Sequence, residues 1–366
     1  MHWKVGFEIE LLAPPGFSRR DLADEIARRS PGATVIPAFH PQAELSLVEN
    51  APVFENLTLA YDVISADGNL IARCADDLTL QNGLDTTAPP KPGWYRIVGD
   101  DARILRLIMQ HAKPEARLDK VLMPAAKLFG TKLECFENGM VRLADSYNAP
   151  IAMAAPLPGE RERPCEIITA PITNDHSARL SALLEPAGEM GFAIPQEAAL
   201  HIHFDAEDLC NARVFANLVH LFSTHGQQLK YLLGTNPNCR RLGSWPDQLQ
   251  QLVFQPGFDQ LTWQDARDEL SKVELTKYVD FNVFNMVHEP PGKHTFEVRI
   301  LPVSLDVETI MLAAALFEAL LGHVVAQKSS QRQATQRSLF QVIDSLTIDS
   351  SVKRHWLNNC NLKNIP

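Results

Sequence analysis

Short segments spread along the sequence alternate between apolar and polar residues, which is the pattern of β-strands with one buried face. In KVGFEIELL, at residues 4–12, Glu8 and Glu10 would share one face and the apolar residues between them the other. ALHIHFD at 199–205 and HTFEVRIL at 294–301 repeat this alternation. A chain that carries such segments far apart must bring them into a sheet to bury their apolar faces.

Further strands and several helices are expected between these segments. KLECFENGMVRLAD indicates a hairpin, with Asn138-Gly139 as the dipeptide that type I′ turns prefer. The strands lack regular βαβ alternation, so an α+β fold with a mostly antiparallel sheet is predicted. Other predicted strands cover two runs within 57–80, then 94–98, 165–171 and 278–286. Predicted helices cover 18–29 (N-capped by Ser18), 102–111, 177–190, 209–233, 263–275 and 307–327 (N-capped by Asp306).

Bulk properties exclude some classes of protein. The 366 residues carry a net charge of −10, whereas nucleic-acid binders usually have a basic excess. The charged start MHWKVGFEIE does not predict a signal peptide, and the apolar run 311–326 is interrupted by Glu318 and His323. Six scattered cysteines without a CxxC pair predict neither a disulfide framework nor a zinc ribbon. We therefore expect a cytoplasmic protein with no nucleic-acid or membrane partner.

The polar faces of the predicted strands are rich in glutamate and histidine. His201 and His203 share one face of their strand, Glu297 and Arg299 share one face of theirs, and Glu166 lies among apolar neighbours. Each strand alone could simply have a solvated face. Together, glutamates and histidines favour a site for a hard divalent cation, Mg²⁺ or Mn²⁺, that would offset the repulsion between carboxylates.

The ordered motifs resemble the carboxylate–amine ligase superfamily, which includes glutamine synthetase and glutamate–cysteine ligase, and most closely its amidoligase branch. The resemblance spans about residues 4–327 and leaves 328–366 as a polar, helical C-terminal tail. It implies a glutamine-synthetase-like catalytic fold, with a curved antiparallel sheet and helices packed on its outer face. The motifs are GFEIEL (6–11), CEIITAPI (165–172), HIHFD (201–205), KYVDFNV (277–283) and HTFEVRI (294–300).

The resemblance also implies roles for individual residues. Arg299 would stabilise the transferring phosphoryl group, and Asn282 would contact nucleotide or substrate. Lys277 would face the nucleotide where the family pattern often has arginine, and His203 would contact substrate or orient the site. Asp77 loosely matches an Asp-x-Ser stretch of the family. The implied metal ligands are Glu8, Glu10, Glu166, His201 and Glu297.

The implied activity is an ATP- and Mg²⁺-dependent ligation of a carboxylate to an amine through an acyl phosphate. The substrates would be small molecules or peptides, and an oligomer is compatible with the sequence. Arg240 and Arg241, in a Pro/Gly loop, form either a clamp for a substrate carboxylate or a solvated loop.

Two other functions stay open. HxH on a strand also occurs in metal-dependent hydrolases of the amidohydrolase type, although there it lies near the N-terminus of a βα barrel, whereas here it lies mid-chain. The other hypothesis is a non-catalytic binding protein with the same fold.

Overall fold

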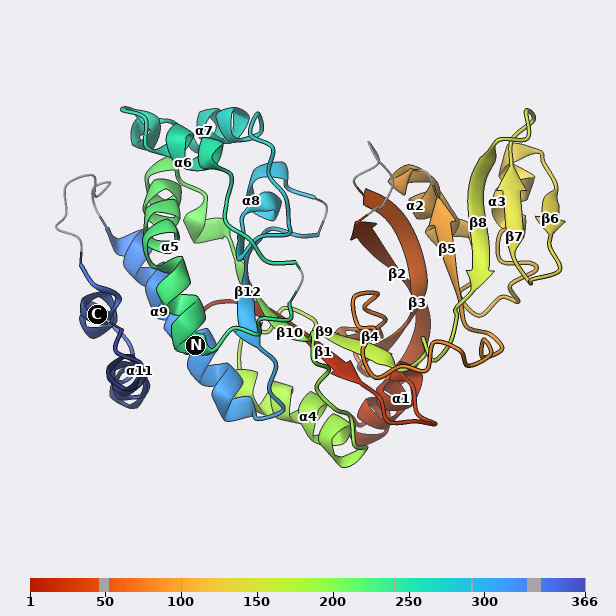
Figure 1. Ribbon diagram of the computed structural model, residues 1–366, viewed down its shortest axis with the longest axis horizontal. Helices are drawn as coiled ribbons and strands as arrows, with labels where there is room; N and C mark the ends of the chain where they lie inside the picture. The colour runs from red at the N-terminus through yellow and green to blue at the C-terminus, as the bar shows by residue number, and fades with distance from the viewer. Residues whose placement is uncertain (46–52, 100, 240, 291, 328–336, 366) are drawn as a thin grey trace. The chain divides into compact units, whose positions relative to one another are not determined.

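The computed structural model describes residues 1–45, 53–99, 101–239, 241–290, 292–327 and 337–365 (Figure 1). The described residues form twelve strands and eleven α-helices, and the strand pairs are antiparallel, which confirms the predicted α+β class. The chain divides into two compact units. Unit 1 contains 1–9, 171–184 and 197–366, and unit 2 contains 10–170 and 185–196.

Unit 1 has a four-stranded sheet in the order β11-β12-β10-β1. Its strands are β1 (Val5–Leu12, of which residues 5–9 belong to unit 1), β10 (Ala199–Asp205), β11 (Phe281–Asn282) and β12 (Thr295–Pro302). Its helices are α4 (His176–Glu189, which ends in unit 2), α5 (Ala212–Leu233), α6 (Asp247–Val253), α7 (Trp263–Leu270), α8 (Phe284–His288), α9 (Val307–Ala326), α10 (Leu339–Ser345) and α11 (Ser350–Leu362), with short 3₁₀ turns η1 (Glu207–Leu209) and η2 (Phe258–Gln260).

An aromatic cluster joins α5 and α9 to the apolar face of this sheet. The ring of Phe222 on α5 lies 4.4 Å from that of Phe281 and 5.4 Å from that of Phe296. Phe317 on α9 stacks on Phe222 at 6.1 Å. A Cβ on Gly226 would lie 3.2 Å from the Phe281 ring, so glycine lets α5 approach the strand closely. Burial of this face leaves the opposite, polar face of the same strands for the site.

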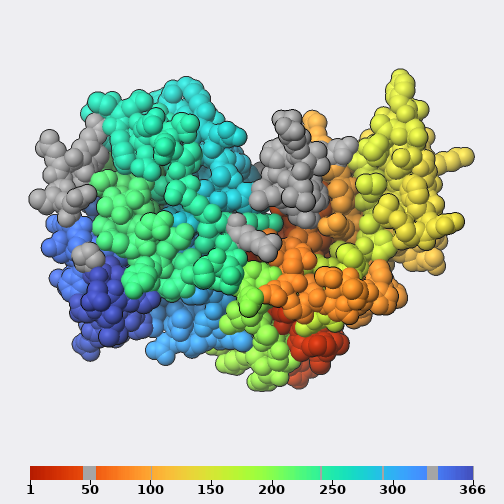
Figure 2. Space-filling view, in the orientation of Figure 1, coloured from red at the N-terminus to blue at the C-terminus, as the bar shows by residue number. Residues whose placement is uncertain are grey.

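The C-terminal helices also pack within unit 1. Trp356 on α11 donates its indole N–H to the Leu312 carbonyl of α9 at 3.1 Å. Figure 2 shows the dark blue α11 against the rest of unit 1. By length and composition alone α9, with 20 residues, could cross a membrane, contrary to the expectation from 311–326. Here one side of α9 is buried, including Leu316, Phe317 and Leu320.

Unit 2 holds the other strands, in the order β9-β4-β3-β5-β8-β7-β6, with β2 paired to β3 and the end of β1 beside β9. Its strands are β2 (Thr34–Leu45), β3 (Val53–Ile64), β4 (Leu70–Ala75), β5 (Tyr95–Gly99), β6 (Leu133–Cys135), β7 (Val141–Ala144), β8 (Pro150–Pro156) and β9 (Pro164–Thr169). Its other helices are α1 (Arg19–Arg29), α2 (Ala102–His111) and α3 (Met123–Phe129).

Several local predictions are confirmed. Ser18 caps α1 in a complete capping box with Asp21, and Asp306 caps α9. The predicted hairpin is present as β6 and β7, but its turn is not type I′. Gly139 has φ +82° while Asn138 is not in the positive-φ region, and the Gly139 N–H donates to the Phe136 carbonyl at 3.0 Å. This is a turn whose left-handed residue is glycine alone, as in a three-residue hairpin loop.

The strand predicted at 278–286 is wrong for most of its length. β11 covers only Phe281 and Asn282, and α8 begins at Phe284. The side chain of Asn282 explains the break, because its Oδ1 accepts the Phe284 N–H at 2.8 Å and turns the chain into the helix.

Candidate metal and active site

Strand register gathers one group of polar side chains in unit 1. Glu8 on β1 lies opposite His201 on β10, and His203 lies opposite Glu297 on β12. Asn282 on β11 also lies opposite Glu297. Because side chains alternate between faces, these residues share one face while Ile202 and Val298 take the buried apolar face. Pairing of four strands, β1, β10, β11 and β12, is thus enough to assemble this group.

Distances between ligand atoms define the group. His203 Nε2 lies 3.2 Å from Glu8 Oε1 and 3.8 Å from Glu297 Oε1. His201 Nδ1 lies 3.2 Å from Glu8 Oε2 and 3.6 Å from Glu297 Oε1. Glu8, His203 and Glu297 each offer one ligand atom, and these atoms lie within 4.8 Å of one another. Carboxylate oxygens with one imidazole suit Mg²⁺ or Mn²⁺, so this group fits such an ion.

Glu297 is the most firmly held member of the group. Arg299 Nη1 donates to its Oε1 at 2.5 Å, and Asn282 Nδ2 donates to its Oε2 at 2.6 Å. Burial by itself would raise the pKa of Glu297, but the charge of Arg299 and the two histidines outweigh it and lower this pKa to about 2. Glu297 is therefore a carboxylate at neutral pH, fixed in direction by two donors.

The pKa values of the neighbouring groups are shifted in different directions. Burial opposes the charge of Glu8, yet His203 and His201 hold its pKa well below the usual value. Burial likewise opposes a proton on His203, but the carboxylates of Glu8 and Glu297 raise its pKa. Burial and Arg299 lower the pKa of His201. His201 is thus the neutral histidine, and positive charge is favoured between the two carboxylates, where a cation would also be favoured.

Polar residues around His203 were not predicted from the sequence as site residues. Thr295 Oγ1 lies 3.4 Å from His203 Nδ1 and accepts from Asn285 Nδ2 at 3.2 Å. Lys293, just before β12, contributes to lowering the pKa of Glu8. Thr295 contacts the imidazole of His203 and Asn285 holds Thr295, a supporting role that leaves no pattern in the sequence. By contrast Asp205, on the same strand face, pairs with Lys4 at 2.6 Å.

A second group lies within unit 2. Glu10 on β1, Asp77 after β4 and Glu166 on β9 each offer one carboxylate oxygen, all within 4.8 Å of one another. All three are at most 8% exposed. Register places Glu166 opposite Ala75, next to the loop that carries Asp77, and His40 Nε2 lies 4.0 Å from Glu166 Oε2. Three buried carboxylates fit a hard divalent cation, which prefers oxygen ligands.

The other predicted site residues lie elsewhere in unit 1 or outside the described part of the chain. Arg241 and Lys277 flank the Tyr278 ring, at 5.3 and 5.4 Å from its centre. The loop that carries Arg241 is anchored by Asp280, which accepts the Gly243 N–H at 3.0 Å. Arg240 is outside the described residues.

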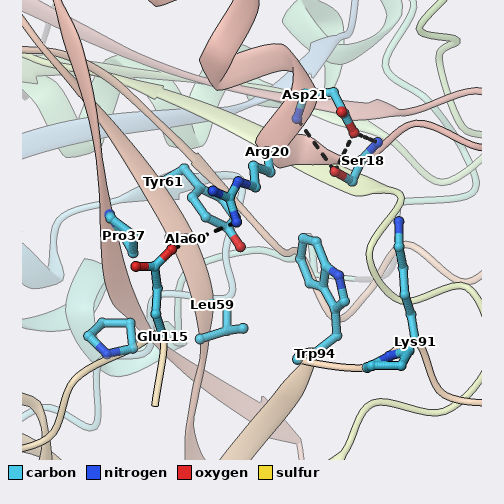
Figure 3. A pocket seen from close by; sticks show the side chains of 13 residues that line it. Ser18, Arg20, Asp21, Pro37, Leu59, Ala60, Tyr61, Lys91, Trp94 and Glu115 are labelled. Atoms are coloured by element: carbon cyan, nitrogen blue, oxygen red, sulfur yellow. Dashed lines mark hydrogen bonds and ion pairs between the residues drawn. The ribbon is translucent and has the colours of Figure 1, made fainter. Parts of the chain in front are cut away.

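Unit 2 also has a pocket of about 370 Å³, which the sequence did not predict (Figure 3). The guanidinium of Arg20 lies over the Tyr61 ring at 5.5 Å and 3.7 Å from Glu115. Trp94 and Lys91 line another wall. Among its lining residues none belongs to either carboxylate group or to the predicted site.

Fold and site define an antiparallel α+β protein with two oxygen-rich groups, each fit to hold a divalent cation. The partly buried group Glu8/His203/Glu297 lies on β1, β10 and β12, and the buried group Glu10/Asp77/Glu166 lies on β1, the loop after β4 and β9. Residues 1–321 match the model of the family described as "Putative amidoligase enzyme", and the chain belongs to this family. The family's description is that of a ligase-type enzyme. Among curated proteins and among solved structures, no match to the chain was found.

Proposed function

We propose that the protein is an ATP- and Mg²⁺-dependent ligase that joins a carboxylate to an amine. The observation that carries the proposal is the pair of ligand groups, the partly buried Glu8/His203/Glu297 and the buried Glu10/Asp77/Glu166, in a member of the amidoligase family. A carboxylate is a poor electrophile, so an amide bond needs activation, and nucleotide-dependent ligases supply it by phosphorylation. This chemistry needs bound divalent cations. Carboxylates held close together can bind such cations, which offset the repulsion between them.

The proposed reaction has two steps. The substrate carboxylate attacks the γ-phosphorus of ATP, the bond to the β-phosphate oxygen breaks, and an acyl phosphate and ADP form. The amine then attacks the acyl carbon, loses a proton, and displaces inorganic phosphate. Bound Mg²⁺ would shield phosphate oxygens during the transfer.

The site residues of unit 1 have the following roles in this proposal. Glu8, His203 and Glu297 hold the cation, and His201 is the neutral imidazole beside Glu8. The charge of Arg299 keeps Glu297 ionised, and the hydrogen bonds from Arg299 and Asn282 orient its carboxylate. Arg241 and Lys277 place positive charge around Tyr278, which suits a substrate carboxylate or a nucleotide phosphate.

The test is ADP formation from ATP, measured over a panel of amino acids, peptides and amines, with and without Mg²⁺. We expect turnover that needs both a carboxylate and Mg²⁺. Glu297→Gln should lower the rate at least ~100-fold, as expected when a ligand that places charge-stabilising groups is lost, while circular dichroism shows a folded chain. Glu137→Gln, at an exposed position, is the matched control and should behave as wild type.

Absence of cation-dependent nucleotide binding in the wild-type protein would overturn the proposal. Isothermal titration with a non-hydrolysable ATP analogue, with and without Mg²⁺, gives this result even when the substrates are not in the panel.

A further inference from the structure

A buried arginine holds the loop that carries Asp77. Arg161, 5% exposed, precedes β9 in unit 2. Its Nη1 donates to the Leu80 carbonyl at 2.5 Å, and its Nη2 donates to Asp76 Oδ1 at 2.5 Å and to the Asp77 carbonyl at 2.9 Å. One guanidinium therefore fixes both ends and the middle of the loop at 76–80, which has no regular secondary structure.

Arg161 donates to the backbone carbonyl of Asp77 and not to its carboxylate. This difference affects whether the carboxylate can bind a cation. The positive charge of Arg161 is matched by the Asp76 carboxylate, whose side chain is fully buried. A guanidinium on the carboxylate of Asp77 would neutralise it and compete with a cation. Because the bond goes to the Asp77 carbonyl, the loop is held while the Asp77 carboxylate keeps its place beside Glu10 and Glu166.

Other contacts complete the support of this loop. The Asp77 carboxylate accepts from the Thr79 N–H at 2.7 Å and the Thr79 hydroxyl at 2.6 Å, which sets its rotamer. The Gln42 side chain, on β2, accepts the Leu78 N–H at 3.2 Å and donates to the Asp76 carbonyl. Arg161 itself is fixed through its own carbonyl, which accepts from Arg19 Nη1 at 2.7 Å.

We propose that Arg161 is a positioning residue, which holds Asp77 as the third carboxylate of the Glu10/Asp77/Glu166 cation site. The inference rests on the proposed function for the presence of a cation, and it adds how a loop outside the sheet is made rigid enough to supply a ligand. Lysine cannot replace Arg161, because one ammonium cannot reproduce the fork that spans Asp76, Asp77 and Leu80.

The test uses Mn²⁺ alone, without nucleotide, titrated into the full chain and followed by the loss of its free-ion electron paramagnetic resonance signal. Arg161→Lys should weaken one class of Mn²⁺ sites by about 10-fold, which is about 1.4 kcal/mol. The control is Arg163→Lys. Arg163 is equally buried and bonds to the Ala13 and Gly83 carbonyls, outside the loop, so its variant should bind Mn²⁺ as wild type.

A double-mutant cycle separates positioning from a general loss of structure. Asp77→Asn should weaken the same class of Mn²⁺ sites, and adding Arg161→Lys to it should cause no further loss. If Arg161→Lys weakens binding equally with and without Asp77, or leaves binding unchanged, the inference is wrong.

Circular dichroism and denaturation check the fold of each variant. Should Arg161→Lys not fold, Asp76→Asn replaces it in the cycle, since it removes the charge that holds Arg161 and keeps the arginine. Failure of the inference is distinguishable from failure of the ligase proposal. Normal Mn²⁺ binding by Asp77→Asn alongside Mg²⁺-dependent ADP formation overturns only the inference, and Mn²⁺ binding that follows the cycle without nucleotide binding overturns only the ligase proposal.

Discussion

Asn282 connects the backbone of unit 1 with the side chains of its ligand group. Its amide donates to Glu297 at 2.6 Å and its carbonyl accepts the Phe284 N–H at 2.8 Å, while only 1% of the residue is exposed. Because both ends of the amide are engaged, its orientation is determined by two different partners. A single side chain therefore ends β11, starts α8 and directs the carboxylate of Glu297.

We predict that Asn282→Ala lowers the free energy of unfolding by about 1–3 kcal/mol, the cost of leaving a buried polar group without its partner. The variant removes the acceptor of the Phe284 N–H and one donor of Glu297. Chemical denaturation in the absence of divalent cations measures the change. Asn361→Ala, at an exposed position of α11, should change stability by less than about 0.5 kcal/mol. Equal stability of Asn282→Ala and wild type would show that water replaces the amide.

At the scale of elements, α1 is stabilised at both ends. Its capping box satisfies N-terminal donors, and Glu25 bonds to Arg28 and Arg29 in the last two turns at 2.7 Å each. These hydrogen bonds, that with Arg28 first, lower the pKa of Glu25 from 4.5 to about 2. Glu25 thus contributes stability above its usual pKa, and the contribution is lost as the pH falls toward 2.

The matching prediction concerns pH. Glu25→Gln should be less stable than wild type at pH 7, and the difference should narrow steadily from about pH 4.5 downward because the wild-type carboxylate then gains a proton in the unfolded state. Because Arg28 and Arg29 are exposed to solvent, 1 M salt should narrow the difference in stability as well. The measurement is denaturation of both proteins across this pH range. A difference in unfolding free energy that grows as the pH falls would contradict a lowered pKa for Glu25.

The elements also show what could be predicted from sequence. Helices with caps and long apolar faces, α1, α2, α5 and α9, were predicted close to their true bounds because their signals are local. The strand predicted at 278–286 was not, because apolar and polar residues alternate only as far as Val283, and the Asn282 side chain then turns the backbone into α8. A side-chain bond that competes with a strand leaves no periodic signal.

The candidate site likewise has residues that a local sequence pattern predicts and residues that it does not. Glu8, His201, His203 and Glu297 could be placed on shared faces, because alternation and antiparallel pairing decide which side chains meet. Asp77 was matched only loosely, since it lies in a loop whose place depends on Arg161, 84 residues later in the chain. Thr295 and Asn285 were missed because these common polar residues acquire their role only through tertiary contacts, Thr295 with His203 and Asn285 with Thr295.

For the whole molecule, a bound cation should act on stability as well as on activity. Mg²⁺ or Mn²⁺ at about 100 times its dissociation constant should raise the free energy of unfolding by about 2.7 kcal/mol for each site present only in the folded chain. Calorimetry with EDTA and then with added Mg²⁺ measures this. In Glu10→Gln the increase should shrink, whereas Glu137→Gln should keep it. An increase of the same size in all three proteins would place the cation elsewhere.

The first strand supplies a glutamate to each ligand group, Glu8 to one and Glu10 to the other. Since the two carboxylates are separated by a single residue, any change of register by one position would turn both toward the hydrophobic interior and expose Phe7 and Ile9 in their place. A one-residue deletion in this short segment should therefore remove one carboxylate from each ligand group at the same time.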